Sequence, residues 1–157
     1  MKIFSVVTVT AALLLTAAGC RTAGEPAAKP ELRAFSADDT RAAKETAAKF
    51  AEGFAASLKD GDFAHWRANM PEESAAKVGD SRFRDMRAEL TAFFGEFTGA
   101  EFLGEIITGD LRNYLWKLSF VRKEKEKRQI SEIVYFVRVF CEEGKPPAIS
   151  GFGVKRF

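Results

Sequence analysis

The sequence contains few of the residues from which catalytic and metal sites are usually built. Its 157 residues include one histidine, His65, and two cysteines, Cys20 and Cys141. It has no H-x-x-x-H or C-x-x-C motif and no acidic D-x-D-x-D-G loop, so neither a zinc nor a calcium site is predicted. We therefore expect no metal and no cofactor.

The sequence also lacks a clear excess of charge of either sign. Lys and Arg together number 24 and Asp and Glu 22, which gives a formal net charge of +2. Proteins that bind nucleic acids usually show a basic excess or a basic stripe, so we expect no nucleic-acid partner. A content of 46% hydrophobic and 29% charged residues is typical of one globular domain, here with an additional segment at the start.

The first twenty residues differ in composition from the rest of the chain. Lys2 is their only charged residue, and residues 3–18 are apolar or small. This layout is typical of a secretory signal, and the apolar run is too short for a convincing transmembrane helix. The segment ends in LTAAGC at positions 15–20, which resembles the lipobox of bacterial lipoproteins.

This resemblance implies that residues 1–20 are a lipoprotein signal peptide ending in the lipobox cysteine. In that family the cysteine, here Cys20, receives a diacylglyceryl group, the signal is cut just before it, and the new amino terminus is acylated. Ala17 stands where the family most often has leucine, and the alternative is an ordinary cleaved signal with an incidental cysteine. Two or three acyl chains would anchor the protein stably in a membrane of the bacterial cell envelope, facing the periplasm or the cell exterior.

A lipidated Cys20 would leave Cys141 as the only thiol, so no internal disulfide is expected. Cys141 lies in an apolar alternation and is predicted to be a small buried hydrophobic residue. Residues 21–36 are rich in Ala and Pro without a sustained period, which indicates a flexible tether. A single α+β domain is then predicted at 37–157.

A long first helix is predicted directly after this tether. Ser36 can cap a helix, and Asp38 and Asp39 suit the positive end of the helix dipole. Apolar residues then recur at steps of three and four, which forms one stripe. They are Ala43, Ala47, Phe50, Phe54 and Leu58.

Two further helices are predicted before the strands begin. Residues 63–70 indicate a short helix that ends before Pro71, and 71–80 indicate a loop or a poorly defined helical turn. Ser81 can cap a third helix, which the apolar pattern extends to about residue 97.

The second half of the chain predicts a four-stranded antiparallel meander. Strands are expected at 100–108, 111–122, 129–141 and 148–157, joined by turns at 109–110, 122–128 and 142–147. In the third strand both faces carry apolar residues: Ile133, Tyr135, Val137, Val139 and Cys141 on one, and Val134, Phe136, Arg138 and Phe140 on the other. The helices would cover one face, and the second apolar face predicts a cavity, a partner subunit or a strongly bent sheet.

This order of elements resembles small bacterial lipoproteins with a cystatin-like or NTF2-like domain. The segments that carry the resemblance are LKDGDF at 58–63, WKLSF at 116–120 and YFVRVF at 135–140. The resemblance covers about 37–157. It implies a long helix across a curved antiparallel sheet, often with a cone-shaped pocket between them. Enzymes of the wider group usually place a histidine and carboxylates in this pocket.

The large number of aromatic residues suggests where a ligand would bind. We expect Phe54 and Phe136 to be buried where the first helix meets the sheet. If the helix and the sheet do not close completely, some of the rings would line an apolar pocket. The candidate ligand-binding residues are Phe54, Trp66, Trp116 and Phe136.

Three functions are consistent with these patterns. The first is a non-enzymatic domain that binds a protein partner or a small apolar ligand, and the second is an NTF2-like enzyme that uses His65 and an unidentified carboxylate. The third is a homodimer that associates through the outer face of the sheet. General acid or base catalysis needs a second positioned group, which the sequence does not identify, so we favour a non-enzyme without catalytic residues.

Overall fold

The computed structural model describes residues 36–124 and 127–155. All of these residues belong to one compact unit. The predicted signal peptide with Cys20 lies outside the described residues, as does the predicted tether up to residue 35. Ser36, which we assigned to the tether, is the N-cap of the first helix.

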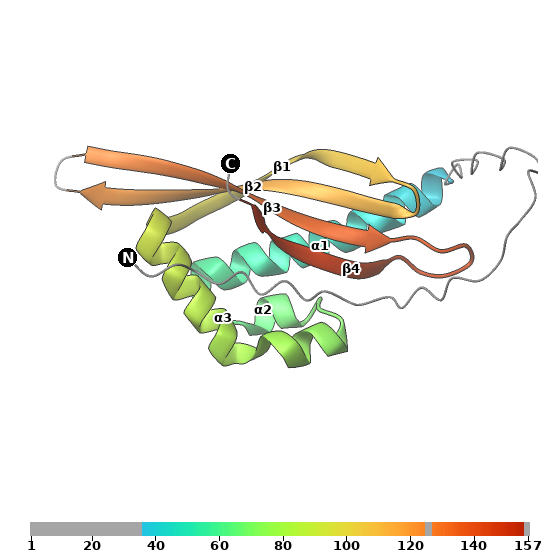
Figure 1. Ribbon diagram of the computed structural model, residues 1–157, viewed down its shortest axis with the longest axis horizontal. Coiled ribbons are helices and arrows are strands. Elements are labelled where there is room, and N and C mark those ends of the chain that lie inside the picture. Colours follow the sequence, from blue (N-terminus) through green and yellow to red (C-terminus); the bar gives the residue numbers. More distant parts are fainter. Residues whose placement is uncertain (1–35, 125–126, 156–157) are drawn as a thin grey trace, which may run out of the picture. The chain divides into compact units, whose positions relative to one another are not determined.

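The described residues form an α+β domain in which three helices precede four strands. The helices are α1 (Ala37–Asp60), α2 (Ala64–Arg67) and α3 (Glu72–Phe94), and the strands are β1 (Glu96–Thr108), β2 (Leu111–Glu124), β3 (Lys127–Phe140) and β4 (Ala148–Lys155). The strands form one open antiparallel sheet in the order β1-β2-β3-β4, so the predicted meander is confirmed. Figure 1 shows the helices on one side of this sheet, with α1 lying along it.

The first helix forms as the sequence predicts. The Ser36 hydroxyl oxygen accepts a hydrogen bond of 3.0 Å from the Asp39 amide, which satisfies a donor that the first turn would otherwise leave free. Gly61 ends the helix in the left-handed conformation, with φ at 80°. The whole predicted apolar stripe is buried.

The third helix is longer at its start than predicted. Residues 72–80 are helical rather than a loop, because Pro71 precedes the first turn and two glutamates follow at its positive end. Gly79, with φ at 59°, interrupts the helix just before the predicted start at Ser81. The helix also ends earlier than predicted, at Phe94, because Gly95 takes a backbone conformation reserved for glycine.

Two strand boundaries also differ from the prediction. The first strand begins at Glu96 rather than Ala100, so Phe97 belongs to β1 and not to α3. Most of the predicted turn at 122–128 is strand, because Glu124 pairs with Lys127. Register shifts in β1 near Gly99 and Gly104 mark irregularities that bend the sheet.

The core lies between the helices and one face of the sheet. Phe54 of α1 is buried and stacks on Tyr135 of β3, with ring centroids 4.4 Å apart, so its predicted burial at the helix–sheet contact is confirmed. The same prediction for Phe136 is wrong. Strand side chains alternate between faces, so Phe136 lies on the outer face with Leu115 directly opposite, and it is half-buried there.

Candidate functional site

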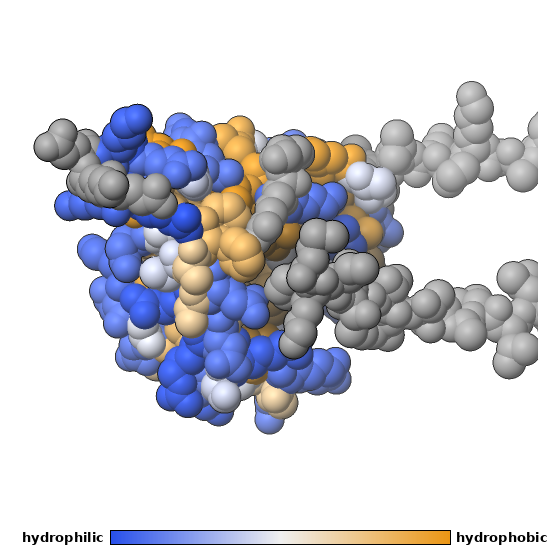
Figure 2. Space-filling view, turned by 60° about the vertical axis from the view of Figure 1, so that its left-hand side comes forward, coloured by the Kyte–Doolittle hydropathy of each residue, from blue (hydrophilic) through white to orange (hydrophobic). Residues whose placement is uncertain are grey.

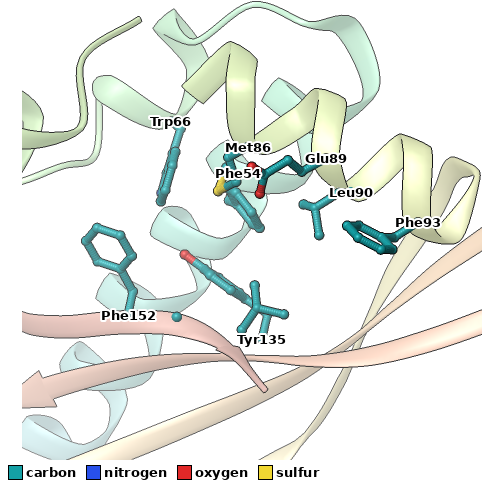
Figure 3. A pocket seen from close by; sticks show the side chains of 10 residues that line it. Phe54, Trp66, Met86, Glu89, Leu90, Phe93, Tyr135 and Phe152 are labelled. Atoms are coloured by element: carbon teal, nitrogen blue, oxygen red, sulfur yellow. The ribbon is translucent and has the colours of Figure 1, made fainter. Parts of the chain in front are cut away.

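A cavity of about 290 Å³ lies between α3 and the sheet. Its lining residues are Phe54, Trp66, Met86, Glu89, Leu90, Phe93, Tyr135, Phe152, Gly153 and Val154. Figure 3 shows α3 above the cavity and β3 and β4 below it, with the Leu90 side chain directed from the helix toward Tyr135. Most of these side chains are apolar, so the cavity favours an apolar occupant.

The short helix α2 places Trp66 in one wall of this cavity. The Ser57 hydroxyl oxygen accepts a hydrogen bond of 3.0 Å from the Trp66 backbone amide, and both residues are buried. The two helices approach so closely that a Cβ added at Gly53 would lie 2.6 Å from the His65 carbonyl oxygen. Asp62 accepts a hydrogen bond of 2.9 Å from the Ala64 amide at the start of α2. These contacts fix Trp66 against α1.

Aromatic rings hold the Trp66 indole from several elements. Its ring centroid lies 4.5 Å from that of Phe54 on α1, 6.1 Å from that of Phe83 on α3 and 5.1 Å from that of Phe152 on β4. Because these contacts come from three elements, the wall is held in place by the packing of the whole domain.

Two polar atoms, the Tyr135 hydroxyl and the Trp66 Nε1, are buried at this site without a hydrogen-bond partner apart from each other. Tyr135 is 1% exposed and Trp66 is 2% exposed. Burial raises the pKa of Tyr135 well above its usual value of 10.0, and the nearby Trp66 side chain offsets part of this rise. The phenol therefore stays protonated near neutral pH and can donate a hydrogen bond.

The structure separates the four predicted ligand-binding residues. Phe54 and Trp66 line the same cavity. Trp116 lies in another hollow, of about 460 Å³, between α1 and β1, where its ring centroid is 5.4 Å from that of Phe102. Phe136 lines a groove of about 380 Å³ on the outer face of the sheet. Of the four predicted ligand-binding residues, only Phe54 and Trp66 therefore line the same cavity.

His65 does not line the α3–sheet cavity. Its side chain is 48% exposed, and its Nε2 atom lies 3.8 Å from an oxygen of Asp60, which is also well exposed. An exposed pair at this distance contributes little to stability and does not exclude water. The position of His65 is therefore that of a surface residue.

The outer face of the sheet combines apolar side chains with ion pairs. The Lys117 Nζ atom lies 2.7 Å from Glu101 and 3.5 Å from Glu132. Figure 2 shows hydrophobic surface gathered at the height of the strands and mainly hydrophilic surface below it. The exposed large hydrophobic residues on this face include Ile106, Ile130 and Phe140. Homodimerisation through this face stays a prediction.

Sequence reasoning missed Tyr135 and Glu89 as site residues. Strand alternation placed Tyr135 on the inner face, and a tyrosine hydroxyl in a buried apolar pattern needs a hydrogen-bond partner, which was the signal that the sequence offered. Glu89 lies next to Leu90 on α3, so helical periodicity alone could have placed a carboxylate at the edge of the apolar stripe.

A buried arginine at another point of the inner face was also missed. Arg112 is 3% exposed, and its Nη1 atom lies 3.8 Å from an oxygen of Glu105. Burial, followed by the Glu105 charge, raises the pKa of Tyr114 to about 12, and Arg112 opposes this rise. Burial likewise raises the pKa of the Cys141 thiol. Cys141 is buried as predicted, and a protonated thiol is a poor nucleophile.

The chain matches no protein-family model, no curated protein and no solved structure. Within residues 36–124 and 127–155, no helix is long and apolar enough to cross a membrane. The same residues include no group of three or more His, Cys, Asp or Glu side chains that could hold a metal ion.

Proposed function

We propose that this protein is a lipid-anchored protein of the bacterial cell envelope whose domain binds a small apolar ligand without catalysing a reaction. The observation that carries the proposal is the apolar α3–sheet cavity of about 290 Å³. The anchor rests on the lipobox resemblance at Cys20. The domain is assigned a cystatin-like or NTF2-like architecture, which is supported by the long α1 on one face of an open meander sheet.

The size and the lining of the cavity favour a small ligand over a protein partner. Ligand pockets usually enclose about 300–1,000 Å³, so this cavity belongs at the lower end of that range. A protein interface instead needs a surface of about 800 Å² on each partner. A cavity held between a helix and a sheet suits one compact apolar molecule.

The polar groups at the cavity do not form an acid–base pair suited to catalysis. Tyr135 has a pKa well above its usual value, so it is a weak acid at neutral pH. Among the lining residues that the structure describes, Glu89 is the only charged one. His65, the base of the enzyme alternative, lies outside the lining. The arrangement therefore suits binding better than proton transfer.

Filling the cavity with a larger side chain is expected to abolish binding. We predict that Leu90→Trp weakens the binding of the neutral dye N-phenyl-1-naphthylamine at least about tenfold, because the indole would occupy the space above Tyr135. The dye fluoresces more strongly in apolar surroundings, so a fluorescence titration measures its affinity. The full-length chain carrying Cys20→Ser serves as the background, since it lacks the acylated cysteine.

Two control variants make this titration specific. Leu103→Trp introduces the same residue at a leucine that is 50% exposed on β1 and lies outside the cavity lining, so it should bind the dye like the parent. His65→Gln should also bind normally. Equal dye affinity in Leu90→Trp and Leu103→Trp would refute the cavity as the binding site.

The anchor is tested separately from the cavity. We expect Cys20→Ser to shift the protein from the membrane fraction to the soluble fraction, because each buried CH₂ group of an acyl chain contributes about 0.8 kcal/mol to membrane binding. Cys141→Ala is the matched control and should remain with the membrane, since Cys141 is buried in the domain. Incorporation of labelled fatty acid should follow the same pattern. Labelling of Cys20→Ser equal to the parent would contradict lipidation at this residue.

A further inference from the structure

We infer that the ligand of the α3–sheet cavity is an uncharged molecule with an apolar body and a hydrogen-bond acceptor, of the carbonyl class, that pairs with the Tyr135 hydroxyl. This inference rests on the proposed function and specifies the chemistry of the ligand. Figure 3 shows the Tyr135 hydroxyl directed toward the space between Phe54, Trp66 and Phe152.

The first support is the set of unmet hydrogen bonds at the cavity. The Tyr135 hydroxyl and the Trp66 indole N–H are both buried, and neither has a hydrogen-bond partner apart from the other. The indole nitrogen only donates, and the hydroxyl donates one hydrogen bond as well as accepting. If the indole donates to the hydroxyl oxygen, the hydroxyl proton is still available. The Tyr135 hydroxyl proton therefore needs an acceptor, which an oxygen atom of a ligand can supply.

The second support is the distribution of charge around the cavity. The lining has no Lys, Arg or His among its described residues, whereas Glu89 contributes a carboxylate. A carboxylate or phosphate on the ligand would be buried without a cation, which is unfavourable, and the exposed Glu89 would add a smaller, solvent-screened repulsion. A neutral carbonyl accepts a hydrogen bond without this penalty.

The third support is the way the hydroxyl can be reached. Phe152 is half-buried on the edge strand β4, between Gly151 and Gly153. Its ring packs on Trp66 and on Phe50, and because it is less buried than these two rings, we expect a ligand to reach the hydroxyl past Phe152. Phe54 on the other side is held between α1 and the sheet and stays in place.

The test compares two probes that differ in one atom group, 2-nonanone and 2-methyl-1-nonene. Each is titrated as a competitor of N-phenyl-1-naphthylamine on the full-length Cys20→Ser chain and on the same chain with Tyr135→Phe. We expect the preference for the ketone over the alkene to fall about threefold to tenfold in Tyr135→Phe, the range that corresponds to one hydrogen bond. Because each protein is compared with itself, differences in probe solubility cancel.

Tyr114→Phe is the matched control, because it removes the hydroxyl of another buried tyrosine that lies outside the cavity lining. It should leave the ketone preference unchanged. The urea midpoint of Tyr135→Phe serves as a folding control, and we expect a modest fall, since the buried Trp66 indole N–H loses the hydroxyl as its acceptor. Nonanoate should compete less well than 2-nonanone, and Glu89→Gln should reduce this difference.

The outcomes separate the inference from the function on which it rests. An equal ketone preference in the parent and in Tyr135→Phe would overturn the inference while leaving the apolar cavity as the binding site. Nonanoate that competes as well as 2-nonanone would overturn the uncharged character of the ligand. Failure of both neutral probes to displace the dye would refute the proposed function together with the inference.

Discussion

Replacing Phe54 with alanine is expected to lower the free energy of unfolding by about 3–5 kcal/mol. Phe54 is 1% exposed, and its ring contacts both Tyr135 of the sheet and Trp66 of α2, with centroid distances of 4.4 Å and 4.5 Å. Truncation would therefore open a space at the point where three elements meet. A loss of this size is a large fraction of the 5–15 kcal/mol that is typical of natural domains, so ~3 kcal/mol would be easily measured.

Urea denaturation of the full-length Cys20→Ser background measures this effect. Phe140→Ala is the matched control, because Phe140 is 38% exposed on β3 and lies on the outer face of the sheet. Its urea midpoint should fall much less than that of Phe54→Ala. Similar midpoints for the two variants would show that α1 does not pack on the sheet through Phe54.

The truncation is also expected to affect ligand binding, since Phe54 lines the α3–sheet cavity. The remaining folded protein would have a larger cavity, and larger ligands would gain affinity relative to smaller ones. Stability and ligand selectivity therefore both depend on Phe54. Truncation of Phe54 is for this reason a poor probe of function, and the Leu90→Trp substitution is preferred.

The order of helices and strands could be predicted because each has its own local signal. The alternation of side chains between the two faces of β3, and the recurrence of apolar residues every three or four positions in α1, depend on neighbouring residues alone. The start of α3 was missed because Pro71 is compatible both with a loop and with the position before a helix, and the choice depends on packing against the rest of the domain. The end of α3 was missed because Phe97 continues the helical pattern although Gly95 breaks the backbone.

The site could be predicted only in part, because a cavity depends on which faces meet. Phe54 and Trp66 belong to helices with one buried side, so their direction toward the sheet followed from the pattern. Phe136 lies on a strand, where one residue of register decides the face on which a side chain lies. Trp116 lies on the inner face opposite Tyr135, but in the hollow beside β1 rather than in the α3–sheet cavity. The unmet hydroxyl of Tyr135 becomes visible only when the surrounding atoms are placed.

Gly95→Ala is expected to be the second strongly destabilising substitution, with a loss of about 2–6 kcal/mol. Gly95 lies between α3 and β1 with φ at 94° and ψ at −163°, a region that is open essentially to glycine alone. A Cβ added here would overlap the Val121 carbonyl group and would lie 2.6 Å from the Arg122 amide nitrogen. These are backbone atoms of β2, so they cannot move aside as a flexible side chain would.

Gly144→Ala separates the two contributions to this loss. Gly144 also has a positive φ, 69°, but nothing lies within 4 Å of the Cβ that alanine would add. It should therefore show only the backbone strain of a left-handed alanine, about 1–2 kcal/mol. If urea midpoints of Gly95→Ala and Gly144→Ala fall equally, the contact between Gly95 and β2 does not exist as described. We expect the urea midpoint of Gly95→Ala to fall further than that of Gly144→Ala. This result would show that the direction of α3 relative to the sheet depends on Gly95. The positions of Met86 and Leu90, which α3 contributes to the cavity lining, would then depend on Gly95 as well.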